Sequence, residues 1–296
     1  MIEQALYEHL LEQQDLADFL ATYAGKPAVF SQEAPADTDS LWEKGQQYGR
    51  VVFSVDLQGD PARIMGGTLV VDIMCKKDEQ FPEDIEPVLR PLIHGYFFSR
   101  DTFTVAAQWR RSDYFTQPKD HVSGCTLSFD LLAFPILTTS TPDVVARFNE
   151  WSSGIENLYV TNYDALPAAA WKPTGKESAV YWRVMKDDPA GWIPDTFQTI
   201  WRAATVKGHI FSETPAVAAT VCRDLTIRLY AAKRLQKSGE APIMVNRRNA
   251  SDDSADPLRT GQLTVEATYG VIVHYENENT IDHIRYESDG IYRNLE

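Results

Sequence analysis

Hydrophobic and polar residues alternate along this chain with periods that predict a short series of helices and strands, and the series occurs twice. In the first half, apolar residues with helical spacing predict a helix over residues 2–20, which Gly25 and Pro27 end. Alternation of apolar and polar residues then predicts strands over 51–57 and 64–75. The chain therefore begins with a helix followed by two strands.

A second helix follows these strands. Pro82 suits a first helical turn, and acidic residues such as Glu86 suit the positive end of a helix. Further prolines in this segment predict a short or kinked helix, because proline lacks the N–H that a helical hydrogen bond needs. Strands over 103–109 and 125–134, separated by a polar loop, complete the first half.

The second half repeats this order. Thr141 and Pro142 predict an N-cap followed by proline at the first helical position. Thr214 and Pro215 predict the same start for a later helix that extends to about residue 237. Alternation predicts the strands of this half over residues 179–185, 197–206, 243–245 and 263–273.

Landmarks in the first half have counterparts in the second at a spacing of roughly 129 to 136 residues, a drift that loops can absorb. The pairs are Arg50 and Ala179, Leu69 and Trp201, Pro82 and Pro215, and Leu127 and Leu263. We interpret this spacing as the duplication of a small α/β unit. We expect an α+β protein of two similar modules, residues 1–138 and 139–275, each a mainly antiparallel sheet packed against helices.

The tail over residues 276–296 has its own signal. Asp289 and Gly290 lie between two short apolar segments, which is typical of a β-hairpin. An isolated hairpin is marginal in water, so we expect this arm to pack on its own domain or on a neighbouring subunit. A frayed terminus is the alternative.

Composition and charge narrow the range of functions. The chain has 296 residues, 44% hydrophobic and 24% charged, as two globular domains require. Its net charge is −14, and residues 1–60 contain eleven acidic and three basic residues, a balance of −8. Phosphate binding needs clustered Lys and Arg, which here occur only in pairs. We expect DNA only as a passing neighbour in an acidic channel; simple solubility is the alternative explanation for the charge.

Cysteines and apolar segments indicate a soluble protein of a reducing cytosol. Cys75, Cys125 and Cys222 are odd in number and lie in apolar stretches, so we expect no disulfide framework. No basic leader precedes an apolar segment, and no apolar run approaches 18 residues. We therefore expect no contact with a membrane.

The sequence contains no motif that is typical of a catalytic, cofactor or metal site. Gly66 and Gly67 lack Rossmann spacing, and Lys176 lacks the earlier glycine of a phosphate loop. The acidic residues after Pro82 are explained by the helix end rather than by an acid pair. The histidines form no metal-ligand pattern, and we expect each at the surface or at a strand end. They are His9, His94, His121, His209, His274 and His283.

Aromatic residues are the candidates for contact with partners. Trp42, Trp171 and Trp192 lie in predicted loops, where an exposed aromatic side chain is typical of an interface. A place in the core is the alternative. Tyr286 and Tyr292 belong to the predicted C-terminal hairpin. We take these five as candidate interface residues.

Both halves contain segments whose order is similar to that of a known family. In the first half they are the helix ending near Gly25, the strand over 51–57, the segment 67–73, the helix after Pro82 and the strand over 124–134. In the second half they are the segments 180–183 and 201–202, the helix after Pro215 and the segment 261–270. Together they resemble bacteriophage tail-terminator or tail-completion proteins, over most of the chain.

This resemblance implies a structural virion protein that forms a ring at the end of a phage tail, commonly six modules around a channel. With two modules in one chain, three chains could form a pseudo-sixfold ring, or six chains could form two stacked rings. The implied partners are other copies of the chain, the tail-tube protein and neck or connector proteins of the head-to-tail junction. Assembly would take place in the host bacterial cytoplasm.

Two alternatives remain open. A tail-tube or baseplate-hub protein belongs to the same structural class but would consist mostly of β barrels with a long loop between sheets. An enzyme would need a site assembled from scattered Asp, Glu and His side chains, in a concave pocket with strongly perturbed pKa values. We expect no enzymatic activity and no cofactor.

Overall fold

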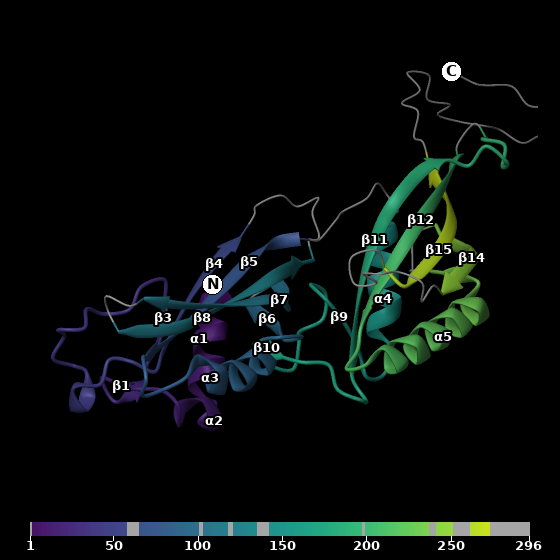
Figure 1. The fold of residues 1–296 in the computed structure, drawn as a ribbon. Coiled ribbons are helices and arrows are strands. Elements are labelled where there is room, and N and C mark those ends of the chain that lie inside the picture. Colours follow the sequence, from purple (N-terminus) through teal and green to yellow (C-terminus); the bar gives the residue numbers. More distant parts are fainter. Residues whose placement is uncertain are drawn as a thin grey trace, which may run out of the picture.

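The computed structural model describes residues 2–57, 65–100, 103–117, 121–134, 142–196, 199–236, 241–250 and 261–272. The predicted C-terminal hairpin, with Tyr286 and Tyr292, lies outside the described residues, as do His274 and His283. Most of the described secondary structure is strand, with helices packed on the sheets, which agrees with the predicted mixed α and β content. Figure 1 shows the two halves as two lobes joined side by side.

The first half starts with helices and ends with two long strands. Its elements are α1 (Ile2–Leu11), α2 (Gln14–Ala17), β1 (Thr22–Tyr23), β2 (Lys26–Pro27), β3 (Val29–Ser31), the 3-10 helix η1 (Glu43–Gly45), β4 (Arg50–Leu57), β5 (Met65–Lys76), α3 (Pro82–Leu89), the 3-10 helix η2 (Arg90–Leu92), β6 (Phe97–Arg100), β7 (Phe103–Gln117) and β8 (Val122–Ala133). The predicted strands β4 and β5 and the short helix after Pro82 are confirmed.

Two predictions for this half were wrong in detail. The single helix expected over residues 2–20 is divided, because Gln13 has an extended backbone that redirects the chain and buries Leu16 completely. Strand β7 continues to Gln117 instead of ending at Trp109. Its second part is largely exposed and polar, so hydrophobic alternation could not reveal it, although it pairs with β8 throughout.

The second half contains α4 (Val144–Ser153), β9 (Leu158–Val160), β10 (Ala170–Trp171), β11 (Ser178–Pro189), β12 (Thr199–Phe211), α5 (Pro215–Ala232), β13 (Arg234–Leu235), β14 (Ile243–Ala250) and β15 (Leu263–Ile272). Thr214 caps α5 as predicted, because its side chain accepts a hydrogen bond from Val217 N at 3.3 Å. The cap of α4 was assigned wrongly to Thr141. Asp143 performs this role, accepting a hydrogen bond from Ala146 N at 3.0 Å.

The strands of the described residues form two large sheets and one small one. The first sheet has the order β10-β6-β7-β8-β5-β4-β3, and the second sheet has the order β13-β14-β15-β12-β11-β9. Strands β1 and β2 form a separate pair. Neighbours are antiparallel except at one end of each large sheet, where β3 is parallel to β4 and β9 is parallel to β11.

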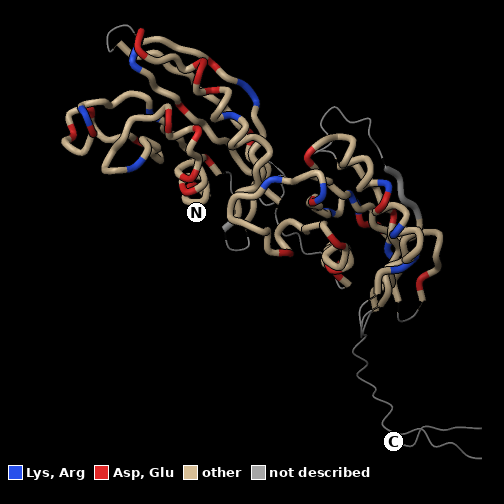
Figure 2. The backbone as a smooth tube through the Cα atoms, turned by 90° about the horizontal axis from the view of Figure 1, so that it is seen from below, with Lys and Arg blue, Asp and Glu red and all other residues tan. Residues whose placement is uncertain are grey.

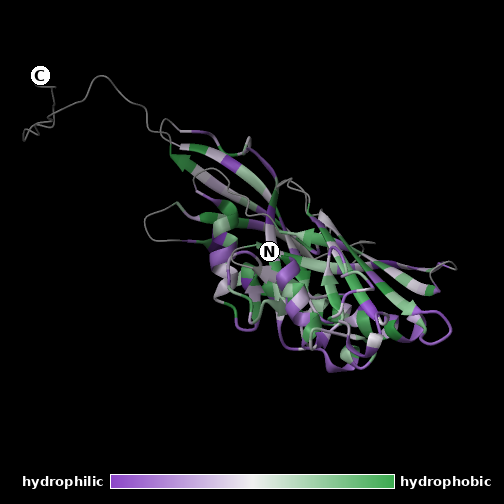
Figure 3. Cartoon of the chain, turned by 90° about the vertical axis from the view of Figure 1, so that its left-hand side faces the viewer, coloured by the Kyte–Doolittle hydropathy of each residue, from purple (hydrophilic) through white to green (hydrophobic). Residues whose placement is uncertain are grey.

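Each large sheet buries one face against helices. Hydrophobic and hydrophilic residues alternate along the strands (Figure 3), which leaves one apolar face for the helices to cover. In the second core, the Trp182 ring packs on Phe148 with centroids 4.9 Å apart, and its Nε1 donates to Ser152 Oγ at 2.7 Å. Gly208 makes room for this ring, because a Cβ there would lie 2.7 Å from the indole.

The predicted surface position of the histidines was wrong for His9 and His209, which are buried. His9 lies on α1, and its Nε2 donates to the carbonyl of Leu92 at 2.8 Å. Burial lowers the pKa of His9, with the hydrogen bond to Leu92 and the charge of Glu12 acting in the opposite direction. The buried apolar face of α1 thus includes one polar ring, whose hydrogen-bonding requirement is met by a backbone carbonyl of η2.

Replacing Leu229 with alanine tests the packing of α5. Leu229 is completely buried in the second core, so Leu229→Ala should lower the free energy of unfolding by about 2–5 kcal/mol. Ile227 lies on the same helix but is 59% exposed, so Ile227→Ala should change the free energy of unfolding by less than about 0.5 kcal/mol. Urea unfolding measures both values. Equal losses would contradict the assigned face of α5.

Replacing His9 with glutamine tests its buried state. Because the folded protein lowers the pKa of His9, the unfolded chain binds a proton more readily, and stability should fall as the pH drops below about 6.5. His9→Gln should show a smaller decrease in melting temperature between pH 7 and pH 5 than the unaltered chain. The same decrease in both proteins would contradict the lowered pKa.

Candidate functional site at the junction of the two sheets

An aromatic cluster joins the two halves. The cluster contains four buried residues from each half. The first half contributes Phe97, Ala106, Leu132 and Phe134, and the second contributes Trp171, Ala179, Tyr181 and Phe211. Phe211 lies at the centre, with its ring 5.1 Å from that of Phe97 and 5.0 Å from that of Phe134. These residues point away from the two helix-covered cores, so the sheets meet through faces that the helices leave open.

A short strand also crosses from one half to the other. Strand β10 precedes β11 in sequence but pairs with β6, the outer strand of the first half's own sheet. Trp171 lies opposite Phe97, and Ser99 N donates to Ala169 O at 2.7 Å. The Trp171 ring contacts Tyr159 of its own half at 5.3 Å and Phe97 at 5.5 Å. Backbone pairing and ring packing therefore hold the same contact.

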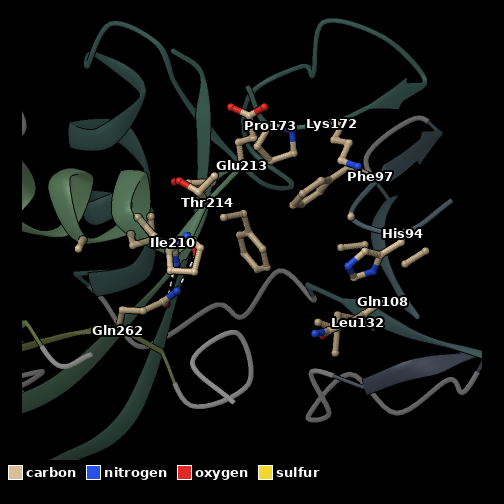
Figure 4. Close-up of a pocket in the computed structure, with 18 residues that line it drawn as sticks. His94, Phe97, Gln108, Leu132, Lys172, Pro173, Ile210, Glu213, Thr214 and Gln262 are labelled. Carbon is tan, nitrogen blue, oxygen red and sulfur yellow. Dashed lines mark hydrogen bonds between the residues drawn. The ribbon is translucent and has the colours of Figure 1, made fainter. Parts of the chain in front are cut away.

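A cavity of about 710 Å³ lies beside this cluster (Figure 4). Its apolar wall is formed mainly by residues of the two sheets, and polar side chains lie around it. The polar residues are His94, Gln108, Lys172, Ser212, Glu213, Thr214 and Gln262. Both halves contribute, so this pocket exists only when the junction is formed.

The charged groups of the pocket do not form a catalytic pair. Burial lowers the pKa of Lys172, and Glu213 opposes that shift. Partial burial, followed by the charges of Lys172 and Arg90, lowers the pKa of His94. Its Nδ1 accepts a hydrogen bond from Trp109 N at 3.1 Å, which requires a free lone pair on that nitrogen. Among the described residues, no hydrogen bond or ion pair joins His94, Lys172 and Glu213.

Lys172 is held by the junction itself. Its Nζ lies 5.4 Å from the centre of the Tyr96 ring, a cation–π contact across the two halves. A Cβ on Gly95 would lie 3.3 Å from Lys172 Cε, so the glycine leaves room for the lysine stem. The side chain thus has a structural role in joining the halves.

Other titratable groups are accounted for by packing. Burial raises the pKa of Cys75 to about 12 and that of Cys125 to about 11, so both thiols are protonated and unreactive at neutral pH. All three cysteines are buried, as the apolar context of each predicts. No group of three or more His, Cys, Asp or Glu side chains in the described ranges could hold a metal ion.

The interpretation of Glu86 as a helix-end acid was wrong. Glu86 is buried on the inner side of α3, where it accepts hydrogen bonds from Arg90 Nη1 at 3.1 Å and Ser112 Oγ at 3.0 Å. Ser112 Oγ also accepts from Trp109 Nε1 at 3.1 Å, and the Arg90 guanidinium lies 5.0 Å from the centre of the Trp109 ring. This network ties α3 to β7, which a sequence pattern could not show.

The structure separates the candidate interface tryptophans. Trp42 is buried in its own half, against Tyr23 and Phe30 with ring centroids 4.9 Å and 5.7 Å away, and its exposure was predicted wrongly. Trp171 is also buried, within the junction. Trp192 is 68% exposed, as a contact residue in a loop would be.

Comparison with known proteins does not assign this chain to a family. No family model, curated protein or solved structure matches it. Among the described helices, none is long and apolar enough to cross a membrane. Function must therefore be argued from the fold and the junction. Figure 2 shows Lys and Arg interspersed with Asp and Glu over both lobes, rather than gathered in one basic surface.

Sequence reasoning missed the junction residues. Phe97, Phe134 and Phe211 look like ordinary strand residues, and Lys172 looks like a loop lysine. The signal that could have revealed Phe97 and Phe211 is that each stands beside another apolar residue in its strand, so that both faces of the sheet are apolar there.

Replacing Phe211 with alanine tests the junction. Its ring is almost completely buried between two other rings, so Phe211→Ala should lower the free energy of unfolding by about 3–5 kcal/mol. Phe103 is 40% exposed on β7, and Phe103→Ala, the matched control, should cost less than about 1 kcal/mol. Guanidinium unfolding measures both. Similar costs would show that the halves do not depend on this contact.

Proposed function

We propose that this chain is a structural component of a phage tail or neck, of the tail-terminator or tail-completion type, that assembles into a ring and has no catalytic activity. One observation carries the proposal. The two large sheets are connected in the same order, and they bind each other through their open faces. A unit that binds another unit of its own kind within one chain is suited to binding further copies.

The equivalence of the two halves is supported by their strand order. Starting from the parallel pair, the first sheet has the order β3-β4-β5-β8-β7-β6 and the second has β9-β11-β12-β15-β14-β13. A helix precedes each series, and a helix with proline at its start follows the third strand of each in sequence. We infer two similar modules, over residues 1–138 and 139–275.

Cross-strand partners support the same alignment. Val51 pairs with Ile73 as Val180 pairs with Ile210, and all four side chains are completely buried. Two residues after Val51 on β4 and after Val180 on β11, the next inward position is aromatic. It is Phe53 in the first half and Trp182 in the second.

This alignment fits three of the four sequence landmarks. It matches Arg50 with Ala179 and Leu127 with Leu263, and it keeps Pro82 with Pro215. It matches Leu69 with Val206 instead of Trp201, because Leu69 and Val206 hold the same place in the cross-strand pairing.

The geometry of the junction supports a ring. The first half contributes one surface to it and the second half contributes a different one, so the contact is heterologous. Repeated heterologous contacts form a closed ring when the rotation between units closes. The net charge of −14 would keep DNA from binding to the wall of a channel.

Two further observations favour this proposal over its alternatives. The described strands of each large sheet form an open sheet with two edge strands. This favours the terminator type over a tail-tube or hub protein built from β barrels. The junction pocket has no paired acid, base or nucleophile among its described residues, which argues against the enzyme alternative. The place at the tail end rests on the resemblance in element order to tail-terminator proteins.

Measuring the mass of the assembled particle tests the proposal. We expect light scattering during size-exclusion chromatography to give three or six times the 33.4 kDa mass of one chain. Negative-stain images should show rings, and added tail-tube protein should carry a ring at one end. A chain that remains monomeric at every concentration, with and without tail-tube protein, would contradict the proposal.

A further inference from the structure

We propose that a second copy of this chain binds end to end, with its loop between β3 and β4 lying along strand β13 of the first copy. The contact would repeat between chains the pairing of β10 with β6 that exists within one chain. This inference rests on the equivalence of the two halves stated in the proposed function.

The two binding segments occupy equivalent places. Strand β10 belongs to the connection between β9 and β11, and the matching connection of the first half joins β3 to β4. Trp42 precedes Trp171 by 171 − 42 = 129 residues, the same spacing that separates Arg50 from Ala179. The pair Leu41 and Trp42 is therefore the counterpart of β10. Trp42 packs on rings of its own half, as Trp171 does on Tyr159.

The two receiving strands are equivalent as well. Strand β6 pairs with β7 on its inner side, and β13 pairs with β14 in the same position of the second sheet. Strand β10 covers the outer edge of β6, whereas β13 is the last strand of its sheet within the described residues. An edge strand presents unpaired backbone groups to which a segment of another chain can add.

The register predicts which residues would meet. Within the chain, Ala170 lies opposite Phe98 and Trp171 lies opposite Phe97. Phe98 corresponds to Leu235 and Phe97 to Arg234, because of their partners on β7 and β14. Leu41 of the second copy would thus lie opposite Leu235, and Trp42 opposite Arg234.

The next position in this register brings opposite charges together. Lys172 contacts Tyr96 across the intrachain junction. The counterpart of Lys172 is Glu43, and the counterpart of Tyr96 is Lys233. The segment 32–49 contains four acidic residues and one basic residue, whereas Lys233 and Arg234 are adjacent. The two surfaces are therefore complementary in charge where the register places them together.

Both surfaces have exposed residues beside the buried Trp42 and Leu235, and the surfaces lie at opposite ends of the molecule. Leu41 is 51% exposed, and Glu43, Lys233 and Arg234 are exposed. In Figure 1 the connection between β3 and β4 projects at the left end, while α5 leads from the junction toward β13 at the right. Surfaces in this arrangement bind head to tail and leave a free surface at each end, as a growing ring requires.

Charge exchange tests the contact. Lys233→Glu and Glu43→Lys each place two like charges together, so each should raise the dissociation constant of the assembly at least tenfold. A chain with both changes restores an opposite pair and should assemble within about threefold of the unaltered chain. Lys176→Glu changes the net charge equally at an exposed loop of the same half and should leave assembly unchanged.

A further variant removes the apolar part of the contact without a change of charge. Leu41→Ser should also weaken assembly, and its exposure leaves the fold intact. Glu43 accepts a hydrogen bond from Gly25 N at 3.1 Å, so circular dichroism and melting temperature are measured for every variant.

Mass photometry across a concentration series distinguishes the outcomes. The proposed contact is wrong, and the assembly proposal stands, if all three single variants are folded and assemble like the unaltered chain. These variants are Lys233→Glu, Glu43→Lys and Leu41→Ser. If both single charge changes weaken assembly and the double change does not restore it, the register of Glu43 against Lys233 is wrong. A monomeric unaltered chain would overturn both proposals.

Discussion

The packing of Phe211 between Phe97 and Phe134 is the contact on which the arrangement of the two halves depends. Each large sheet has one face covered by helices, and the other would be exposed to water if the halves stood apart. Burial of aromatic surface on those open faces joins the sheets, and β10 adds backbone pairing to the same place. The pocket, the position of Lys172 and the relative placement of both halves all follow from this contact.

The polar groups at and near the junction have partners that support the structure. Lys172 lies over Tyr96, His94 accepts from the backbone of Trp109, and Glu86 is enclosed by Arg90 and Ser112. In the described part of the chain, each of these side chains has a partner that explains its place. A site of this kind holds two surfaces together, which is the physical basis for proposing an assembly protein.

The proposed equivalence of the two halves has a consequence for assembly. The half that supplies β10 has an edge strand β13 of its own, and the half that receives β10 has a loop around Trp42 that resembles the donor. In the proposed assembly, one such contact within a chain leaves one donor and one acceptor at its ends. The covalent link makes the contact between the two halves intramolecular, which raises their effective concentration for each other.

The sequence by itself determined the order and type of most elements and the cap at Thr214, because these depend on spacing and on residues close in the chain. It also indicated apolar, unreactive surroundings for the cysteines. Only the tertiary structure decided that Trp42 and Trp171 are buried, that Glu86 lies in a network and that β10 belongs to the first sheet. Those outcomes depend on residues far apart in sequence, whose meeting is decided by the packing of two open sheet faces and not by local periodicity.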